Sequence, residues 1–420
     1  MPPSSINKRK IVNDPVHGFI TIPDELVFDL MEHPYFQRLR RIKQLGLTHF
    51  VYPGATHTRF QHALGAVHLM GQAIGIIKSK GHEITDEEAE AATVAILLHD
   101  IGHGPFSHAL ESSFIGNIKH EQVSSVIMKR LNKEFNGRLT MAIEIFRGEY
   151  HKKFLTQLVS SQLDMDRLDY LKRDSFYTGV TEGVIGSDRI IKMLDILDDE
   201  LVVEAKGIYS IEKFLIARRL MYWQVYLHKS VLSAENLLVM ILRRARELAL
   251  QGNSLFTTPA LHYFLYNQFP DNLLADNNYS GWEEIIANFT QLDDDDIQVS
   301  AKVWTKHEDK VLALLCKNFI NRNLFKIKMQ NTPFEEKEIN ELRKNAARNF
   351  EVSLGESEYF VISDSISNNT YSSSDEKIRI LYKDGTTKDI TEASDMLNLA
   401  VLSKVVKKYF LGYTKEIEKK

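Results

Sequence analysis

The chain has 420 residues, of which 44% are hydrophobic and 26% are charged, with a net charge of −4. This length corresponds to roughly two to three domains, and the near-neutral charge excludes a general attraction to nucleic acid or acidic lipid. The single cysteine, Cys316, permits no internal disulfide and no thiolate zinc cluster, and we expect it to be buried. We find no signal peptide and no stretch of the ~20 apolar residues that a membrane span needs, so we expect a cytoplasmic protein.

Helical periodicity dominates the first part of the chain. We expect a flexible arm over residues 1–12, followed by a helical domain over residues 13–250. Residues 89–98 form a dense apolar helix in this prediction, ended by the glycines and proline that follow. Two further helices are predicted at 157–173 and 211–250. A short hairpin is predicted between them at 201–210, with its turn at Lys206-Gly207.

The pattern changes near residue 251, where we expect a smaller α+β lobe over residues 251–420 that serves oligomer assembly. The acidic run 293–296 is predicted to be a solvated surface loop. The other expected elements are a loop at 251–259, a charged helix at 335–349, strands at 351–362 and 377–390 with an Asp384-Gly385 turn, a polar loop at 363–374 and a helix at 391–413. The predicted fold class is therefore mainly α, with an α+β lobe at the C-terminus.

Several common catalytic motifs are missing from the sequence. There is no GxxxxGK[ST] phosphate loop, and His82-Glu83 and His120-Glu121 lack the second histidine of HExxH. No GxSxG motif is present, which removes the simplest serine hydrolase interpretation.

Histidines are instead concentrated in one region, since eight of the 15 lie between His57 and His120. His99 and Asp100 end the apolar helix, and a glycine–proline turn follows them. A neutral imidazole and a carboxylate suit Mn, Fe, Zn or Ni. His62 and Asp166 are each flanked by apolar helical residues and can point inward. The sequence therefore predicts a metal site made of His62, His99, Asp100 and Asp166.

These motifs resemble those of the HD-domain deoxynucleoside triphosphohydrolases, also called dNTPases or dGTPases. The resemblance is greatest to the branch that carries a SAM domain in addition to the HD domain. About a dozen residues precede Asn13, so we expect no SAM domain here. The matching segments are residues 13–18 (NDPVHG), 34–46, 59–62, 99–108, 120–121, 164–170 and, more weakly, 222–229.

The resemblance implies a helical HD fold and hydrolysis of a dNTP to deoxynucleoside and inorganic triphosphate. It implies the same four metal ligands, with an ion that activates water and polarises the α-phosphate. His108 is the expected general acid, oriented by Glu111, where the family often has Asp. His103 and His120 are expected to contact phosphate or a second cation, such as the Mg²⁺ that accompanies a triphosphate.

The resemblance also implies a set of substrate contacts. Arg59, Arg218 and Lys229 match phosphate-binding positions, and Tyr226 matches a tyrosine that stacks on the sugar. Gln44, Tyr170 and Asp174 match residues that read the sugar 3′-hydroxyl, and Arg167 stands where the family often has lysine. Arg218, Tyr222, Tyr226 and Lys229 are spaced as one face of a helix.

A regulatory site for a guanine nucleotide, dGTP or GTP, is implied at an interface between subunits, and with it a homodimer or homotetramer. A carboxylate can accept hydrogen bonds from the N1 and N2 protons of guanine. The carboxylate at this position is Glu32 here, where the related enzymes have Asp. Arg40 can donate to the guanine O6. The full set of matching positions is Lys10, Ile11, Asn13, Glu32, Gln37 and Arg40.

Two other functions stay open from the residues alone. The first is an HD phosphohydrolase that acts on another nucleotide, either as a 5′-nucleotidase or on a signalling nucleotide. The second is an oligomer that senses nucleotides or binds nucleic acid, for which the near-neutral charge gives no support.

Overall fold

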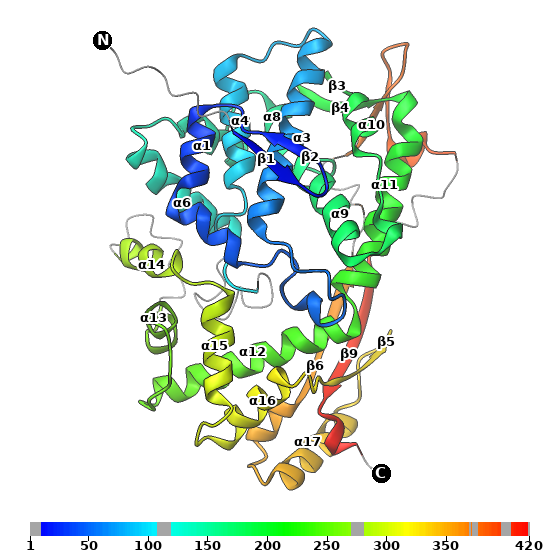
Figure 1. Cartoon of the computed structure of the whole chain (residues 1–420). Coiled ribbons are helices and arrows are strands. Elements are labelled where there is room, and N and C mark those ends of the chain that lie inside the picture. Colours follow the sequence, from blue (N-terminus) through cyan, green and yellow to red (C-terminus); the bar gives the residue numbers. More distant parts are fainter. Residues whose placement is uncertain are drawn as a thin grey trace.

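The computed structural model describes residues 10–106, 119–269, 281–368, 371, 377–395 and 405–418. Figure 1 shows two lobes, a helical one that holds the N-terminal half and a second one built around helix α12. One continuous hydrophobic core runs through both lobes, from Ile20 to Ile417. The chain is thus mainly helical with small sheets, as the sequence predicts.

The helical lobe contains ten α-helices among the described residues. They are α1 (Glu25–Glu32), α2 (Pro34–Gln37), α3 (Arg59–Ser79), α4 (Asp86–Leu98), α6 (His120–Glu134), α7 (Thr140–Arg147), α8 (Lys153–Val159), α9 (Met165–Thr178), α10 (Ser187–Lys192) and α11 (Ile208–Met221). Helices α3 and α4 pack against each other at the centre of the lobe, and α9 packs against α3 (Figure 1).

Local sequence explains where the two central helices begin and why they are buried. Thr85 and Glu88 form a capping box at the start of α4, which satisfies the first free N–H groups of the helix. From Ala91 to Leu98 every α4 side chain is buried, which confirms the predicted apolar helix. Helix α9 begins at Asp164, whose carboxylate accepts from the N–H of Arg167.

The second lobe packs helices around α12 and a three-stranded sheet. Its elements are α12 (Lys229–Leu250), α13 (Pro259–Tyr266), α14 (Trp282–Phe289), α15 (Asp294–Trp304), α16 (Lys310–Ile320), β5 (Lys326–Gln330), α17 (Glu336–Phe350), β6 (Val361–Asn368) and β9 (Val406–Tyr413). Strand β9 lies between β5 and β6 and is antiparallel to both. The predicted charged helix (α17) and the buried Cys316 in α16 are confirmed.

Two small sheets belong to the helical lobe. Strands β1 (Ile11–Asp14) and β2 (Gly18–Thr21) form an N-terminal hairpin. The other sheet has the order β3-β4-β7-β8, from β3 (Leu194–Leu197), β4 (Glu200–Glu204), β7 (Arg379–Leu381) and β8 (Thr387–Asp389), with the short helix α18 (Ile390–Ala393) after it. Because β7 pairs in parallel with β4, a segment from the end of the chain completes the helical lobe. The predicted turn at Asp384-Gly385 does join β7 and β8.

Several predicted elements are wrong in position or type. The hairpin lies at 194–204 and turns at Asp198 and Asp199, both with positive φ, rather than at Lys206-Gly207. The expected helix at 157–173 is interrupted between α8 and α9, and the one at 211–250 is broken by a π-helical turn at Tyr222–Tyr226. Residues 406–413 form a strand rather than a helix, and strand β6 starts at Val361 and occupies part of the expected polar loop.

The acidic run 293–296 is the largest error. It caps and starts helix α15 and is not a solvated loop. Asp294 is fully buried, and Asp293 is 6% exposed. Both carboxylates are used by the neighbouring lobe, since Arg41 contacts Asp293 and the N–H of Lys43 donates to Asp294 at 3.0 Å.

No single helix in the described parts of the chain is long and apolar enough to cross a membrane. One bent pair, Ala205–Tyr226 with Lys229–Leu250 at 55°, meets that test of length and composition only when taken together.

Candidate metal centre

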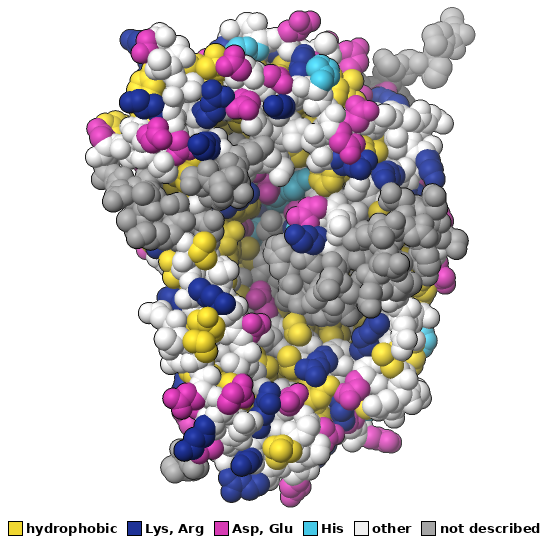
Figure 2. Space-filling model, turned by 180° about the vertical axis from the view of Figure 1, so that it is seen from behind, with side chains coloured by type: hydrophobic (Ala, Val, Ile, Leu, Met, Phe, Trp, Pro, Cys, Tyr) yellow, Lys and Arg dark blue, Asp and Glu magenta, His cyan; other side chains and the backbone are white. Residues whose placement is uncertain are grey.

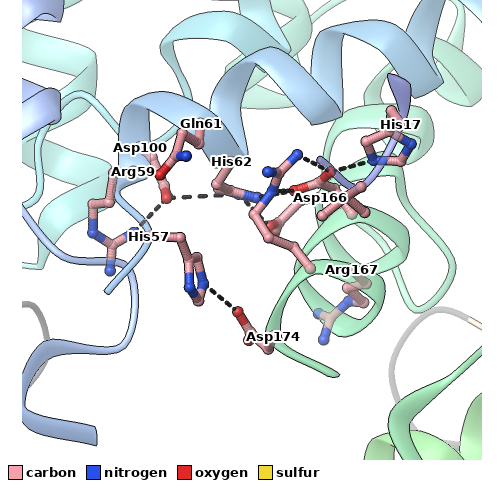
Figure 3. Close-up of polar contacts among 12 residues, drawn as sticks. His17, His57, Arg59, Gln61, His62, Asp100, Asp166, Arg167 and Asp174 are labelled. Carbon is pink, nitrogen blue, oxygen red and sulfur yellow. Dashed lines mark hydrogen bonds and ion pairs between the residues drawn. The ribbon is translucent and has the colours of Figure 1, made fainter. Parts of the chain in front are cut away.

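Four side chains meet in the helical lobe, and Figure 3 labels His62, Asp100 and Asp166 among them. His62 lies in the first turn of α3, His99 and Asp100 follow the end of α4, and Asp166 lies in the first turn of α9. The Nε2 atoms of His62 and His99 are 3.3 Å apart. An Asp166 oxygen is 3.1 Å from the first and 3.6 Å from the second. An Asp100 oxygen lies 3.3 Å from His99 Nε2.

The Nδ1 atom of each histidine already has a hydrogen-bond partner within the protein. His62 Nδ1 contacts Asp169 Oδ2 at 2.8 Å, and His99 Nδ1 donates to the carbonyl of Ile96 at 2.6 Å. These contacts hold a proton on each Nδ1 atom, so that an ion which displaces the Nε2 protons would find both Nε2 lone pairs facing the space between the four side chains. Two such nitrogens and two carboxylates make a donor set that fits a divalent transition metal.

The electrostatics of the cluster favour a cation. Burial alone would raise the pKa of Asp166, but hydrogen bonds from His62 and His99 hold it far below its usual range. Burial would likewise lower the pKa of His62, whereas Asp166 and Asp169 raise it to about 10. The carboxylates are therefore ionised and require positive charge between them.

Solvent reaches the centre from one side. His62 is fully buried, while the side chain of Asp166 is 30% exposed. Figure 2 shows histidine side chains recessed in a hollow near the middle of that face of the molecule. A substrate can therefore approach the Asp166 side of the cluster.

A second group of possible ligands adjoins the first through Asp100. Its Oδ1 atom is 3.3 Å from His103 Nε2, and the rings of His103 and His120 stack with centroids 3.7 Å apart. Asp100, His103 and His120 could together hold a cation. Arg59 contacts Asp100 from the other side, and burial together with Arg59 lowers the pKa of His103 well below its usual value. The other two expected catalytic residues, His108 and Glu111, lie outside the described residues.

Further along α9 from Asp166, Asp174 is the centre of a group of polar contacts, here called the Asp174 wall. His57 Nε2 contacts its Oδ1 at 2.8 Å, and the hydroxyl of Tyr226 donates to its Oδ2 at 2.7 Å. Burial and Asp174 raise the pKa of Tyr226, so its hydroxyl stays a donor. Two buried atoms here have no hydrogen-bond partner among the described residues, Gln44 Oε1 and His57 Nδ1. Such orphan atoms are common where a ligand supplies the missing partner.

Of the expected phosphate-binding cations beyond Arg59, Arg167 and Arg218 lie near Tyr170, whereas Lys229 lies past a bend in the chain. The chain turns sharply between α11 and α12, so the four residues from Arg218 to Lys229 do not share one helix face as predicted. Arg218 donates to Gln162 at 3.1 Å, and Arg167 donates to the carbonyl of Ser161 at 2.6 Å. The ring of Tyr170 lies 6.3 Å from that of Tyr226. Lys229 is exposed at the start of α12, beyond the bend.

Comparison with known proteins agrees with this geometry. An HD domain model matches residues 59–174, and a model of the HD associated region matches residues 185–258. The chain is 36% identical over 331 residues to the uncharacterized protein YwfO of Bacillus subtilis, covering 77% of this chain and 73% of that protein. The chain belongs to the HD-domain family. It is therefore an HD-type, metal-dependent hydrolase that binds a divalent metal ion.

Two further relatives of this HD protein narrow the comparison. The crystal structure of a phosphohydrolase from Bacteroides thetaiotaomicron is 57% identical, with a TM-score of 0.92 over 97% of this chain and 100% of that one. The deoxynucleoside triphosphate triphosphohydrolase SAMHD1 homolog of Dictyostelium discoideum is 35% identical over 245 residues. That match covers 54% of this chain and 47% of the relative, so the chain spans about half of the named triphosphohydrolase.

Several residues that organise the centre of this HD protein were not predicted. Asp169 binds His62, and His57 binds Asp174. Asp14, His17 and Arg173 complete a buried network around Asp169. Most of these residues lie inside segments 13–18 and 164–170, which carry the family resemblance. The motifs therefore marked these segments as part of the site, but they did not indicate what each residue does.

The residues expected at a regulatory site lie mainly on the surface of the N-terminal hairpin and the α1–α2 region. Lys10 Nζ lies 4.5 Å from the centre of the Phe28 ring. Gln37 donates to the carbonyl of Met31 at 2.8 Å and accepts from Arg40 at 2.8 Å, and Arg40 also lies over the ring of Phe60. Ile11, Asn13 and Glu32 are exposed. A flat, polar surface of this kind is compatible with a subunit interface.

Proposed function

We propose that this HD protein hydrolyses deoxynucleoside triphosphates to the deoxynucleoside and inorganic triphosphate. The observation that carries the proposal is the position of the Asp174 wall. A carboxylate held by His57 and Tyr226 lies further along α9 from the metal ligand Asp166. Arg167 and Arg218 lie close to Tyr170, whose ring neighbours that of Tyr226. A nucleotide needs both features, an acceptor for a sugar hydroxyl and cations for phosphate.

The metal ligands in this proposal are His62, His99, Asp100 and Asp166, and the ion is Mn, Fe, Zn or Ni. When bound, such an ion polarises a phosphoryl oxygen and lowers the pKa of water. The protein's part is to hold four ligands in place and to keep Asp166 ionised, which the hydrogen bonds from His62 and His99 support.

Cationic and neutral groups around the centre are then assigned to the triphosphate. Arg59 is held in place by Asp100, and its guanidinium is the cation that we assign to the phosphate oxygens nearest the metal ion. The depressed pKa of His103 keeps it neutral, which suits a hydrogen-bond donor or a ligand to a second cation such as Mg²⁺. His120 stacks on it, and His108 with Glu111 is assigned to protonation of the leaving 5′ oxygen.

Selection of the deoxyribose is assigned to Asp174 with Gln44, and to the two tyrosines opposite. Both oxygens of Asp174 already accept one hydrogen bond each, so its orientation is set before the sugar arrives. Gln44 Oε1 has no described partner and can accept from a sugar hydroxyl. Tyr170 and Tyr226, whose rings lie 6.3 Å apart, are assigned to excluding a 2′-hydroxyl by size.

Activation by dGTP or GTP at the exposed hairpin surface, and assembly into a dimer or tetramer, are further parts of the proposal. They rest on the family resemblance of Lys10, Ile11, Asn13, Glu32, Gln37 and Arg40. An Arg40→Ala variant that keeps full activity and the same oligomeric state at every nucleotide concentration would remove them.

The deciding experiment is product analysis by phosphorus NMR with metal-loaded protein. Each dNTP and rNTP is incubated singly and in pairs with dGTP. Inorganic triphosphate released only from deoxynucleotides, and absent with Asp166→Ala, supports the proposal. Asp86→Ala is the matched control, because Asp86 is a fully exposed carboxylate on α4. Orthophosphate or pyrophosphate as product would assign another nucleotide substrate, and binding without turnover would indicate a sensor.

A further inference from the structure

The N-terminal hairpin reaches the metal centre with two side chains. Asp14, at the end of β1, uses its Oδ1 atom to accept from the N–H groups of Val16 and His17 at 3.0 and 2.9 Å. This turn directs His17 inward, where its Nε2 atom lies 2.7 Å from Asp169 Oδ1. The side chain of His17 is 2% exposed and that of Asp169 is fully buried.

Asp169 connects this hairpin to the metal ligand His62. Its second oxygen contacts His62 Nδ1 at 2.8 Å. Arg173, one turn further along α9, donates to Asp169 at 2.8 Å and to Asp14 at 2.8 Å. The chain of contacts therefore runs from the hairpin through one carboxylate to the imidazole, with a buried guanidinium holding both ends.

The packing leaves this network no freedom to move away. Gly65 on α3 faces Asp169, and a Cβ atom at that position would lie 2.0 Å from Asp169 Oδ1 and 2.3 Å from Arg173 Nη2. Only glycine permits this close approach of α3 and α9. Arg173 and the two histidines also hold the pKa of Asp169 well below its usual range, against the effect of burial.

The hairpin is anchored to the lobe by few side chains. Ile11 is 66% exposed and Phe19 is 72% exposed on its outer face, whereas Ile20 is the fully buried residue of β2. A two-stranded ribbon is marginally stable by itself. Its position on the lobe therefore depends on Ile20 together with the polar contacts of Asp14 and His17.

We propose that Asp14 and His17 are positioning residues for the metal ligand His62, so that docking of the hairpin β1–β2 and retention of the metal ion are linked. The inference rests on the metal ligands of the proposed function but not on its substrate. A hydrogen-bond partner fixes the tautomer and direction of a metal-bound imidazole, and its loss typically weakens metal affinity about 10- to 100-fold. Linkage is reciprocal, so removing the ion must loosen the hairpin.

The test is the affinity of the full-length protein for Co²⁺, measured by competition with a chelator. His17→Ala and Asp14→Asn are expected to weaken binding about tenfold, the low end of the range for a direct imidazole partner, because both act on His62 through Asp169. His17→Gln, which can still donate to Asp169, is expected to recover part of the loss. His82→Ala is the matched control. His82 also pairs with an aspartate, Asp195, at 2.6 Å, but this pair is not part of the network around Asp169. Circular dichroism melting verifies that each variant is folded.

A second experiment tests whether removing the metal ion loosens the hairpin. It measures amide hydrogen exchange of residues 11–21 in the unmutated protein. Chelation is expected to accelerate exchange in the hairpin while α4 stays protected. Affinity within twofold of the unmutated protein in a folded His17→Ala variant, or hairpin exchange that does not change on removal of the metal, would overturn the inference. Turnover is assayed separately, so a protein that binds cobalt in a His17-dependent way but cleaves no dNTP contradicts only the proposed substrate.

Discussion

The carboxylate of Asp294 accepts a hydrogen bond from the backbone N–H of Phe106 at 2.8 Å. Phe106 has a positive φ of 52° and ends the turn that follows His99 and Asp100. The other Asp294 oxygen accepts from the N–H of Lys43 at 3.0 Å. The first residue of α15 thus holds two loops of the helical lobe, and the second lobe helps to shape the metal centre.

Asp294→Ala is expected to destabilise the protein, because it leaves two backbone N–H groups without their acceptor. A buried donor that loses its partner costs about 1–3 kcal/mol, and urea denaturation measures the change. Asp295→Ala is the control, since Asp295 is exposed on the same turn. Equal stability of the two variants would show that the Asp294 contacts contribute nothing.

Arg38→Lys is expected to disturb the same region although the positive charge is kept. The fully buried guanidinium donates to the carbonyls of Leu292, Ile101 and His103, each at 2.9 Å. Lysine offers one centre and cannot reach all three, so we expect a loss of at least about 2 kcal/mol in the free energy of unfolding. Arg41→Lys, at a half-exposed position, should change stability far less. Denaturant titration of both variants in parallel provides the comparison.

His57→Phe is expected to weaken recognition of the sugar while leaving metal binding intact. The phenyl ring can keep the stacking on Tyr177, 4.5 Å away, but it cannot contact Asp174. If the substrate is a dNTP, kcat/KM should fall about tenfold, and the preference over 3′-deoxy analogues should shrink. Tyr177→Phe serves as the control. An unchanged preference would show that His57 does not orient Asp174.

Glu235→Gln on α12 is expected to stabilise the protein at alkaline pH. Burial raises the pKa of Glu235 to about 7, so the folded state binds its proton more tightly than the unfolded state does. This contribution to stability is complete below the unfolded pKa of ~4.3 and is lost as pH rises through 7. At pH 8 the variant should gain on the order of 1 kcal/mol after allowance for partial exposure.

Thermal melting from pH 4 to pH 8 checks this prediction. The gain should vanish at the acid end, where the glutamate of the unmutated protein is protonated in both states. Glu87→Gln, at an exposed position on α4, should show no such pH dependence. A gain of equal size at all pH values would contradict the role given to the buried carboxyl.

Local pattern was sufficient for much of this protein. The apolar run of α4, with its capping residues and the glycines after it, depends on neighbours in sequence and was predicted correctly. The same applies to the helix α17 and to the turn between β7 and β8. His62, His99, Asp100 and Asp166 could also be named in advance, because each lies at a helix end or in a helical turn within a distinctive motif, and the structure brings all four together.

What short-range pattern could not decide was which distant groups meet. His17 and Asp169 are 152 positions apart, and Phe106 and Asp294 are 188 apart. An acidic run carries the same local signal whether it is solvated or paired with the N–H groups and cations of another lobe. Strand β9 ends in a run of four buried residues, Phe410 to Tyr413, in place of strict alternation, so its period resembled neither type clearly. Burial and pairing arise only when the lobes pack, and that packing turns a list of histidines and carboxylates into a centre of fixed geometry.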